Sequence, residues 1–294
     1  ELTHLFASDP QRHHRFWYAP PIYRNNIWQV PAVIRLMAFS AGAGRLGELA
    51  NPWGWPMPTS TYTLSLKLAD EVGYWDPVVI SEDWHMYLRC FFAKHGQISI
   101  TPIYLPTSSD AMSGETVWQA LANYYRREVR HAWGAEDVGY ILQQWRRSPG
   151  TPLRRKLHCF LRILHLNLLR STSWFIVALG SLAAALSHNP LTTTLPGQSM
   201  RPDLIQFVST LGVTGAMALW AVERTRCLSH SKDSRMAALT REIASWTLLP
   251  VLAFAFKALP GLHAQTKLLF GSQLTYQGTP KEASLQNLAA PPGV

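Results

Sequence analysis

The pattern of apolar and polar positions divides the chain into two unlike halves. Over residues 1–150 apolar positions alternate with carboxylates, prolines and glycines, whereas the second half consists of long apolar stretches separated by basic loops. Apolar residues at helical spacing predict helices over 64–71, 82–94 and 116–130, and alternation predicts a strand over 98–106. Because helices alternate with strands, we expect the first half to be an α/β domain.

Proline and glycine are frequent in the first 60 residues and limit the helices expected there. We predict only a short helix near 32–39, because Gly42, Gly44 and Gly47 follow it. Their Gly-x-Gly-x-x-Gly spacing mimics a dinucleotide-binding loop, but no strand-to-helix context accompanies it, so we interpret the segment as a flexible loop. Gly73 is expected to cap the helix that precedes it.

Three apolar stretches of the second half are candidates to cross a membrane. Residues 171–188 and 204–222 contain no Asp, Glu, Lys or Arg, and each is long enough for a bilayer core of about 30 Å. A third stretch, 243–262, contains only Lys257, a side chain that could snorkel. Together they predict an all-α transmembrane region over 171–266. The alternative, buried helices of a large soluble core, is disfavoured by the basic flanks.

The charge distribution suggests how these stretches are oriented. The net charge is +9, and basic residues gather just before and between the apolar stretches. This clustering favours a membrane surface over nucleic acid as the partner. By the positive-inside rule we expect 1–170 and 223–242 to be cytoplasmic and 189–203 to lie outside. The basic, leucine-rich segment 151–170 is expected to lie on the membrane as an amphipathic helix, and the polar tail 267–294 to be loosely ordered.

Cysteine and histidine usage predicts neither a disulfide framework nor a metal site. The chain has three cysteines without a Cys-x-x-Cys pair, and no histidine pair has the spacing of metal ligands on a helix. The chain also begins at Glu1 without a signal peptide or an initiator methionine. We therefore expect it to be part of a longer protein with a reducing environment around its globular half.

An acidic pair, Glu82-Asp83, opens the helix predicted over 82–94. Taken alone, acids at a helix start are explained by capping and by the helix dipole. However, the pair follows the turn sequence Gly73-Tyr74-Trp75-Asp76 and an apolar run over 77–80. This combined string resembles the Gly-Gly-Trp-Asp … Glu-Asp-x-x-Leu segment of family 2 glycosyltransferases, which are inverting enzymes with a GT-A fold and in many cases membrane-embedded polymer synthases.

The resemblance implies a role for each residue around this pair. Asp83 would be the general base that deprotonates the acceptor hydroxyl, with Glu82 as its neighbour, because an inverting displacement needs one such base. Trp84, adjacent to Asp83, would contact the acceptor. The resemblance covers about residues 10–145, so we interpret 1–150 as the C-terminal portion of such a catalytic domain.

A second motif follows about forty residues later. Arg127-Glu128-Val129-Arg130 resembles the Gln/Arg-x-x-Arg-Trp motif of the same family. The resemblance implies that Arg130, with Arg127, contacts the donor diphosphate, for which a planar guanidinium is well suited. His131 stands where the family has tryptophan, so either His131 or Trp133 would take the acceptor-binding position. The alternative for the arginines is a solvated basic helix face.

One family feature is absent from the sequence. GT-A enzymes hold the nucleoside diphosphate and a divalent cation with an Asp-x-Asp, and no Asp-x-Asp occurs here. A cation, Mg²⁺ or Mn²⁺, is expected from the family, but its ligands and the nucleotide-binding strands would precede Glu1. The sequence therefore predicts a partial GT-A-like domain followed by transmembrane helices.

These observations lead to two hypotheses of different classes. The first is a membrane-bound inverting glycosyltransferase of the hexosyltransferase type. It would use a nucleotide-sugar donor and a hydroxyl acceptor, glycan or lipid, at the cytoplasmic membrane face. The alternative is a catalytically inactive membrane scaffold that retains part of the transferase fold. A transporter is disfavoured because the chain has few spans and a large polar half.

Overall fold

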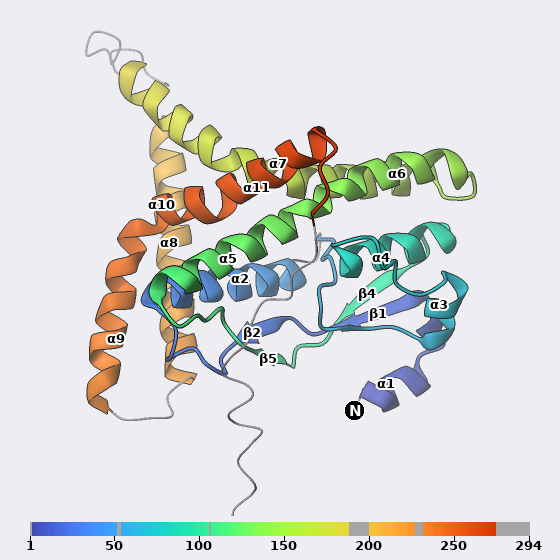
Figure 1. Cartoon of the computed structure of the whole chain (residues 1–294), viewed down its shortest axis with the longest axis horizontal. Coiled ribbons are helices and arrows are strands. Elements are labelled where there is room, and N and C mark those ends of the chain that lie inside the picture. Colours follow the sequence, from blue (N-terminus) through green and yellow to red (C-terminus); the bar gives the residue numbers. More distant parts are fainter. Residues whose placement is uncertain (1, 52–53, 106, 188–199, 227–231, 275–294) are drawn as a thin grey trace, which may run out of the picture.

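The computed structural model describes residues 2–51, 54–105, 107–187, 200–226 and 232–274. Their architecture is mixed and helix-rich, with small sheets on one side of a layer of long helices (Figure 1). The prediction of an α/β first half is therefore confirmed in coarse terms only, since the strands are short.

Two small sheets form the β part. Strand β1 (Arg15–Tyr18) is central in the first sheet, where it runs parallel to β4 (Ser99–Pro102) and antiparallel to β3 (Tyr62–Thr63). In the second sheet β2 (Pro21–Tyr23) runs parallel to β5 (Thr107–Ser109). In the sequence β2 follows β1, and β5 follows β4. The second sheet therefore pairs the continuations of the two strands that run parallel in the first sheet.

The helices account for most of the described chain. The α-helices are α1 (Leu2–Ser8), α2 (Ala32–Ala50), α3 (Leu66–Glu71), α4 (Glu82–Ala93), α5 (Val117–Ala132), α6 (Glu136–Arg147), α7 (Leu153–Ser187), α8 (Met200–Arg226), α9 (Lys232–Ser245), α10 (Leu249–Ala253) and α11 (Leu259–Leu269). Three 3₁₀ segments, η1 (Arg12–His14), η2 (Trp133–Ala135) and η3 (Trp246–Leu248), and one π-helix, η4 (Phe254–Ala258), connect them.

The local signals in the first half are confirmed by α3, α4 and α5. The hydroxyl of Ser65 accepts a hydrogen bond from the Leu68 amide at 3.0 Å, and that of Thr116 accepts one from the Gln119 amide at 3.2 Å. These are N-caps that satisfy amides without an intrahelical partner. Gly73 and Gly96, which follow α3 and α4, have φ of +73° and +78°, a conformation that glycine adopts without strain.

Helix α2 contradicts the prediction of a short helix followed by a glycine loop. It continues through Gly42, Gly44 and Gly47 to Ala50. Each glycine costs about 1 kcal/mol relative to alanine in a helix, but packing outweighs this cost. The first part of α2 is buried against α9 and α8, with Ile34 and Leu36 fully enclosed.

Helix α4 anchors the main hydrophobic core. Met86, Leu88 and Phe91 are buried, and they pack with Phe16 of β1 and Ile141 of α6. This packing fixes the start of α4, and hence its acidic pair, relative to the sheet and to α6.

Two helical segments are long and apolar enough to cross a membrane, namely Leu153–Leu182 and Leu239–Leu269. They overlap the stretches predicted at 171–188 and 243–262. The first lies in the single continuous helix α7, which contains both the segment predicted to lie on the membrane and the span predicted after it, and their division near residue 170 stays a prediction. The stretch 204–222 lies in α8, and some side chains of α8 are not among the described ones. The membrane span predicted there therefore stays a prediction.

Two predicted loops fall largely outside the described residues. The external loop predicted at 189–203 is described only from Met200, as the start of α8, and the tail predicted at 267–294 only up to residue 274. The described part of that tail begins with the end of α11.

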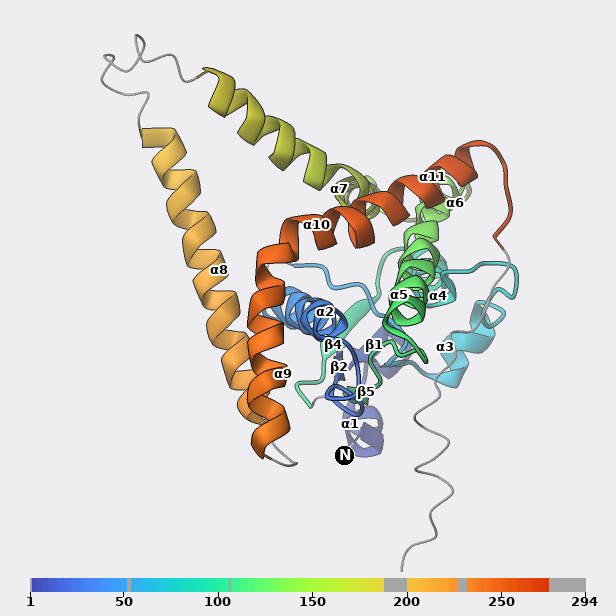
Figure 2. The ribbon, with the colours of Figure 1, turned by 60° about the vertical axis from the view of Figure 1, so that its left-hand side comes forward.

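The second candidate segment is interrupted by two prolines. Pro250 and Pro260 lie in the first turns of α10 and α11, where a missing amide is tolerated. Pro260 cannot donate to the carbonyl of Phe256, and the π-helix η4 lies immediately before it. The chain bends in this region: α9 runs beside α8, whereas α10 and α11 cross over α7 and α5 (Figure 2).

A buried carboxylate ties α8 and α9 to α2. Glu242 of α9 is completely buried and accepts hydrogen bonds from Arg35 Nε at 3.1 Å, Arg224 Nε at 3.0 Å and Trp220 Nε1 at 2.7 Å. Its removal would take a counter-charge away from two buried guanidinium groups.

We predict that Glu242→Gln lowers the free energy of unfolding by about 3–5 kcal/mol, the cost of breaking a buried ion cluster. The matched control is Glu71→Gln, which removes the partly exposed ion pair with Lys94 and should cost at most about 1 kcal/mol. Thermal denaturation of the purified chain in detergent measures both, and equal shifts would contradict a structural role for the cluster.

Candidate active site

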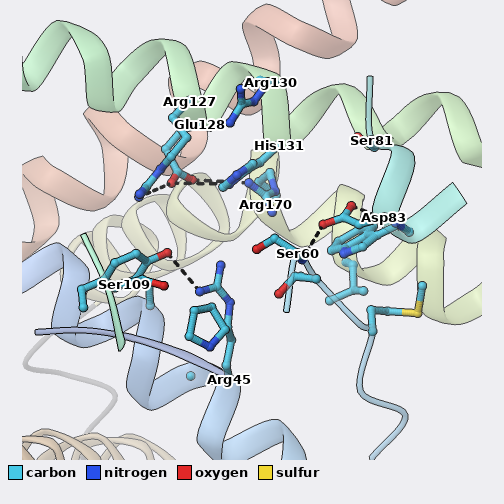
Figure 3. A pocket seen from close by; sticks show the side chains of 18 of the residues that line it. Arg45, Ser60, Ser81, Asp83, Ser109, Arg127, Glu128, Arg130, His131 and Arg170 are labelled. Atoms are coloured by element: carbon cyan, nitrogen blue, oxygen red, sulfur yellow. Dashed lines mark hydrogen bonds and ion pairs between the residues drawn. The ribbon is translucent and has the colours of Figure 1, made fainter. Parts of the chain in front are cut away.

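A cavity of about 700 Å³ lies where α2, α4, α5 and α7 meet. Most of the residues predicted for the site line it, namely Glu82, Asp83, Trp84, Arg127, Arg130 and His131. Asp83 is on one side of this cavity, and the α5 residues are on the other (Figure 3).

Asp83 is held at the start of α4 by backbone amides. One carboxylate oxygen accepts from the Ser60 amide at 3.1 Å, and the other from the Trp84 amide at 2.8 Å. Burial, together with the adjacent Glu82 charge, raises the pKa of Asp83 to about 6, although the hydrogen bonds from the backbone amides oppose this shift. A carboxylate with a pKa just below neutrality is ionised at pH 7 yet basic enough to take a proton.

The opposite wall comes from α5. Because residues three and four positions apart share a helix face, Arg127, Arg130 and His131 all reach the cavity. The Arg127 guanidinium lies 4.4 Å from the ring centroid of Tyr124 and 5.7 Å from that of Tyr23. Its buried Nε has no hydrogen-bond partner among the described residues.

Glu128 is the buried counter-charge of this wall. It accepts a hydrogen bond from Lys257 Nζ at 2.8 Å, and from Arg127 Nη2 and Arg170 Nη1 at 3.4 Å each. Burial alone would raise the pKa of Glu128, but the positive charges of Lys257, Arg127 and Arg170 hold it well below its usual range. Glu128 is therefore an anion in an otherwise cationic wall.

Of the two residues predicted for the aromatic position, only His131 lines the cavity. Burial lowers the pKa of His131 well below its usual value, and Glu128, at 3.9 Å, opposes this effect only in part. His131 is therefore neutral at pH 7. Trp133 instead packs against Ile80 and Val129 with 3% of its surface exposed, so the structure places it in the core and not in the cavity.

Three cationic residues of the cavity were not predicted. Arg45 on α2 donates to the Tyr23 hydroxyl at 3.1 Å, Arg170 comes from α7, and Lys257 comes from η4. Arg45 stood in a stretch interpreted as a glycine loop, and Lys257 in one interpreted as a membrane span. One available signal was the acidic residue Glu128 inside the Arg-x-x-Arg frame, which requires cationic partners if it is buried.

The described residues contain no group of three or more His, Cys, Asp or Glu that could hold a metal ion. His85, two residues after Asp83, interacts with Asp137 in the core between α4 and α6, where its Nδ1 lies 2.7 Å from Asp137 Oδ1. The arrangement can thus supply a base and several anion-binding cations, without a described set of metal ligands.

Comparison with known proteins gives one match. Residues 45–187 match the model of the family described as "Glycosyl transferase family group 2". No curated protein and no solved structure matches the chain. The matched segment contains the acidic pair on α4, the arginine motif on α5 and the whole of α7.

We predict that the two tryptophans of the motifs respond differently to truncation. Trp133→Ala should lower the free energy of unfolding by about 3–5 kcal/mol, because it leaves a cavity in the core. Trp84→Ala should cost clearly less, since Trp84 borders an existing cavity. Thermal denaturation compares the two variants, with Trp133→Phe as the control that retains most of the ring. A larger loss for Trp84→Ala would contradict this placement of the two rings.

Proposed function

Since residues 45–187 belong to glycosyl transferase family group 2, we propose that this chain carries the acceptor-side site of an inverting hexosyltransferase. Its substrates would be a nucleotide-sugar donor and a hydroxyl acceptor. The observation that carries the proposal is the placement of Asp83 across one cavity from Arg127 and Arg130 (Figure 3).

The proposed reaction uses these residues in the following way. Asp83 takes the proton of the acceptor hydroxyl while its oxygen attacks the anomeric carbon of the donor sugar. The bond between that carbon and the diphosphate oxygen breaks, and its electron pair leaves with the diphosphate. Attack opposite the leaving group inverts the anomeric configuration. Arg130 and Arg127 stabilise the charge that develops on the diphosphate.

Trp84 and His131 are proposed to hold the acceptor. Both line the cavity, Trp84 next to the base and His131 on the opposite wall. A neutral imidazole can donate one hydrogen bond and accept another, and an indole ring offers an apolar face to a sugar ring. These properties suit a glycan acceptor and also the hydroxyl of a lipid.

We extend the proposal to the setting of the site. Residues 1–150 would be the C-terminal portion of a GT-A-like domain, and the apolar helices would make the protein multi-pass, with the site on the cytoplasmic face. Exposed apolar side chains support membrane contact: Ile176, Val177 and Leu179 of α7 and Phe207 and Leu211 of α8 are each more than 60% exposed. Basic loops on one side support the orientation.

A divalent cation, Mg²⁺ or Mn²⁺, is proposed from the family resemblance alone. The described residues form no donor set for it.

We predict that Asp83→Asn lowers transfer by at least about 100-fold, because the amide cannot take the proton. Binding of inorganic pyrophosphate should be unchanged, since the arginines are intact. Nucleoside diphosphate release by the full-length protein, tested with a panel of nucleotide sugars, measures transfer, and titration calorimetry measures binding. Transfer that survives the substitution would rule out Asp83 as the base.

We also predict an acid limb in the pH profile of transfer. Asp83 must be ionised to act as the base, so the rate should fall as pH drops through about 6, the pKa of Asp83. Because the Glu82 charge raises this pKa, Glu82→Gln should move the limb to lower pH. The exposed Glu115 provides the control, since Glu115→Gln should leave the limb in place. A limb that does not move in Glu82→Gln would contradict the coupling.

A further inference from the structure

The C-terminal helical segment contacts the arginine motif of α5 through the π-helix η4. Lys257 of η4 reaches Glu128 at 2.8 Å across 129 positions of sequence. In the same π-helix, Phe256 packs edge-on against Tyr124 with ring centroids 5.5 Å apart. Tyr124 is also the ring that the Arg127 guanidinium covers. Two residues of η4 therefore contact Tyr124 and Glu128, each of which contacts Arg127. Single π-turns in helices frequently occur at functional sites.

Glu128 and a bound diphosphate would compete for the same guanidinium groups. Arg127 and Arg170 each lie 3.4 Å from Glu128, at the long end for a charge-assisted hydrogen bond. Lys257 makes the shortest of the cationic contacts with Glu128. With Lys257 in place, the buried carboxylate is neutralised without drawing the arginines fully onto itself.

We propose that Lys257 is a positioning residue, which occupies Glu128 so that Arg127 and Arg170 stay available to an anionic ligand in the cavity. The inference rests on the proposed function, since the ligand would be the diphosphate of the donor. It gives the C-terminal helical segment a role in the site: docking of η4 on α5 completes the anion-binding wall. Lys257 acts through Glu128 and needs no contact with the substrate.

The first test compares two substitutions of Lys257 in the full-length protein. Lys257→Gln should weaken inorganic pyrophosphate binding about tenfold, because Glu128 then takes up Arg127 and Arg170. The KM for the donor should rise while kcat changes less, since the base is untouched. Lys257→Arg keeps the charge and should restore binding to within about threefold. Unchanged binding in Lys257→Gln would overturn the proposal, and so would failure of Lys257→Arg to restore it.

The second test removes the competing carboxylate. In the Lys257→Gln background, Glu128→Gln should recover pyrophosphate binding, because nothing then draws the arginines away. Glu48→Gln in the same background is the matched control. It removes a charge from the same cavity, where Glu48 of α2 pairs with Arg162 at 2.7 Å, and it leaves Glu128 and its partners unchanged. Equal recovery by both variants would show a net-charge effect, and no recovery by Glu128→Gln would show direct contact of Lys257 with the ligand. Either result overturns the proposal.

The outcomes also separate this inference from the proposed function. If the unaltered protein does not bind pyrophosphate, the proposed function and the role of Lys257 are both wrong. If it binds pyrophosphate but Lys257→Gln has no effect, only the role of Lys257 falls. If Asp83→Asn retains transfer while the Lys257 variants behave as expected, only the assignment of the base falls.

Discussion

A carboxylate that is buried among helices and remains ionised has to be surrounded by positive charge, and Glu128 imposes this requirement on the candidate site. Taking a carboxylate out of water costs several kcal/mol, so the helix that carries it is stable only with its partners docked. Those partners are Arg170 and Lys257, 42 and 129 positions away in sequence. The cavity wall facing Asp83 therefore depends on α7 and η4 as well as on the arginine motif of α5.

A second buried carboxylate imposes the same requirement for positive charge near the N-terminal end of α2. Glu242 of α9 is enclosed by Arg35 of α2 and by Arg224 and Trp220 of α8. Two buried anions thus join the apolar second half of the chain to the domain with the strands. The helices of the second half are consequently part of the site's framework, and a role limited to membrane attachment would not require these ion clusters.

Much of the candidate site could be predicted because its signals are local. The acids at the start of α4 follow from a helix N-terminus, and the common face of Arg127, Arg130 and His131 follows from helical spacing. Arg45 and Lys257 could not be predicted in this way. The glycines around Arg45 suggested a loop, whereas packing of α2 keeps the helix intact, and the apolar residues around Lys257 suggested a lipid environment, whereas the π-helix directs its ammonium group to Glu128.

The sequence by itself determined the helices α3, α4 and α5, the glycine cap after α3, the resemblance of the acidic and arginine motifs to the transferase family, and the apolar character of the second half. These properties depend on residues within a few positions of each other, where propensity, capping and periodicity act. The tertiary structure decided that Trp133 belongs to the core and that His131 lines the cavity. It also decided that Arg170 and Lys257 complete the cationic wall. These outcomes depend on contacts between segments that are distant in sequence, including those that neutralise buried charge. No local sequence pattern specifies which segments make such contacts.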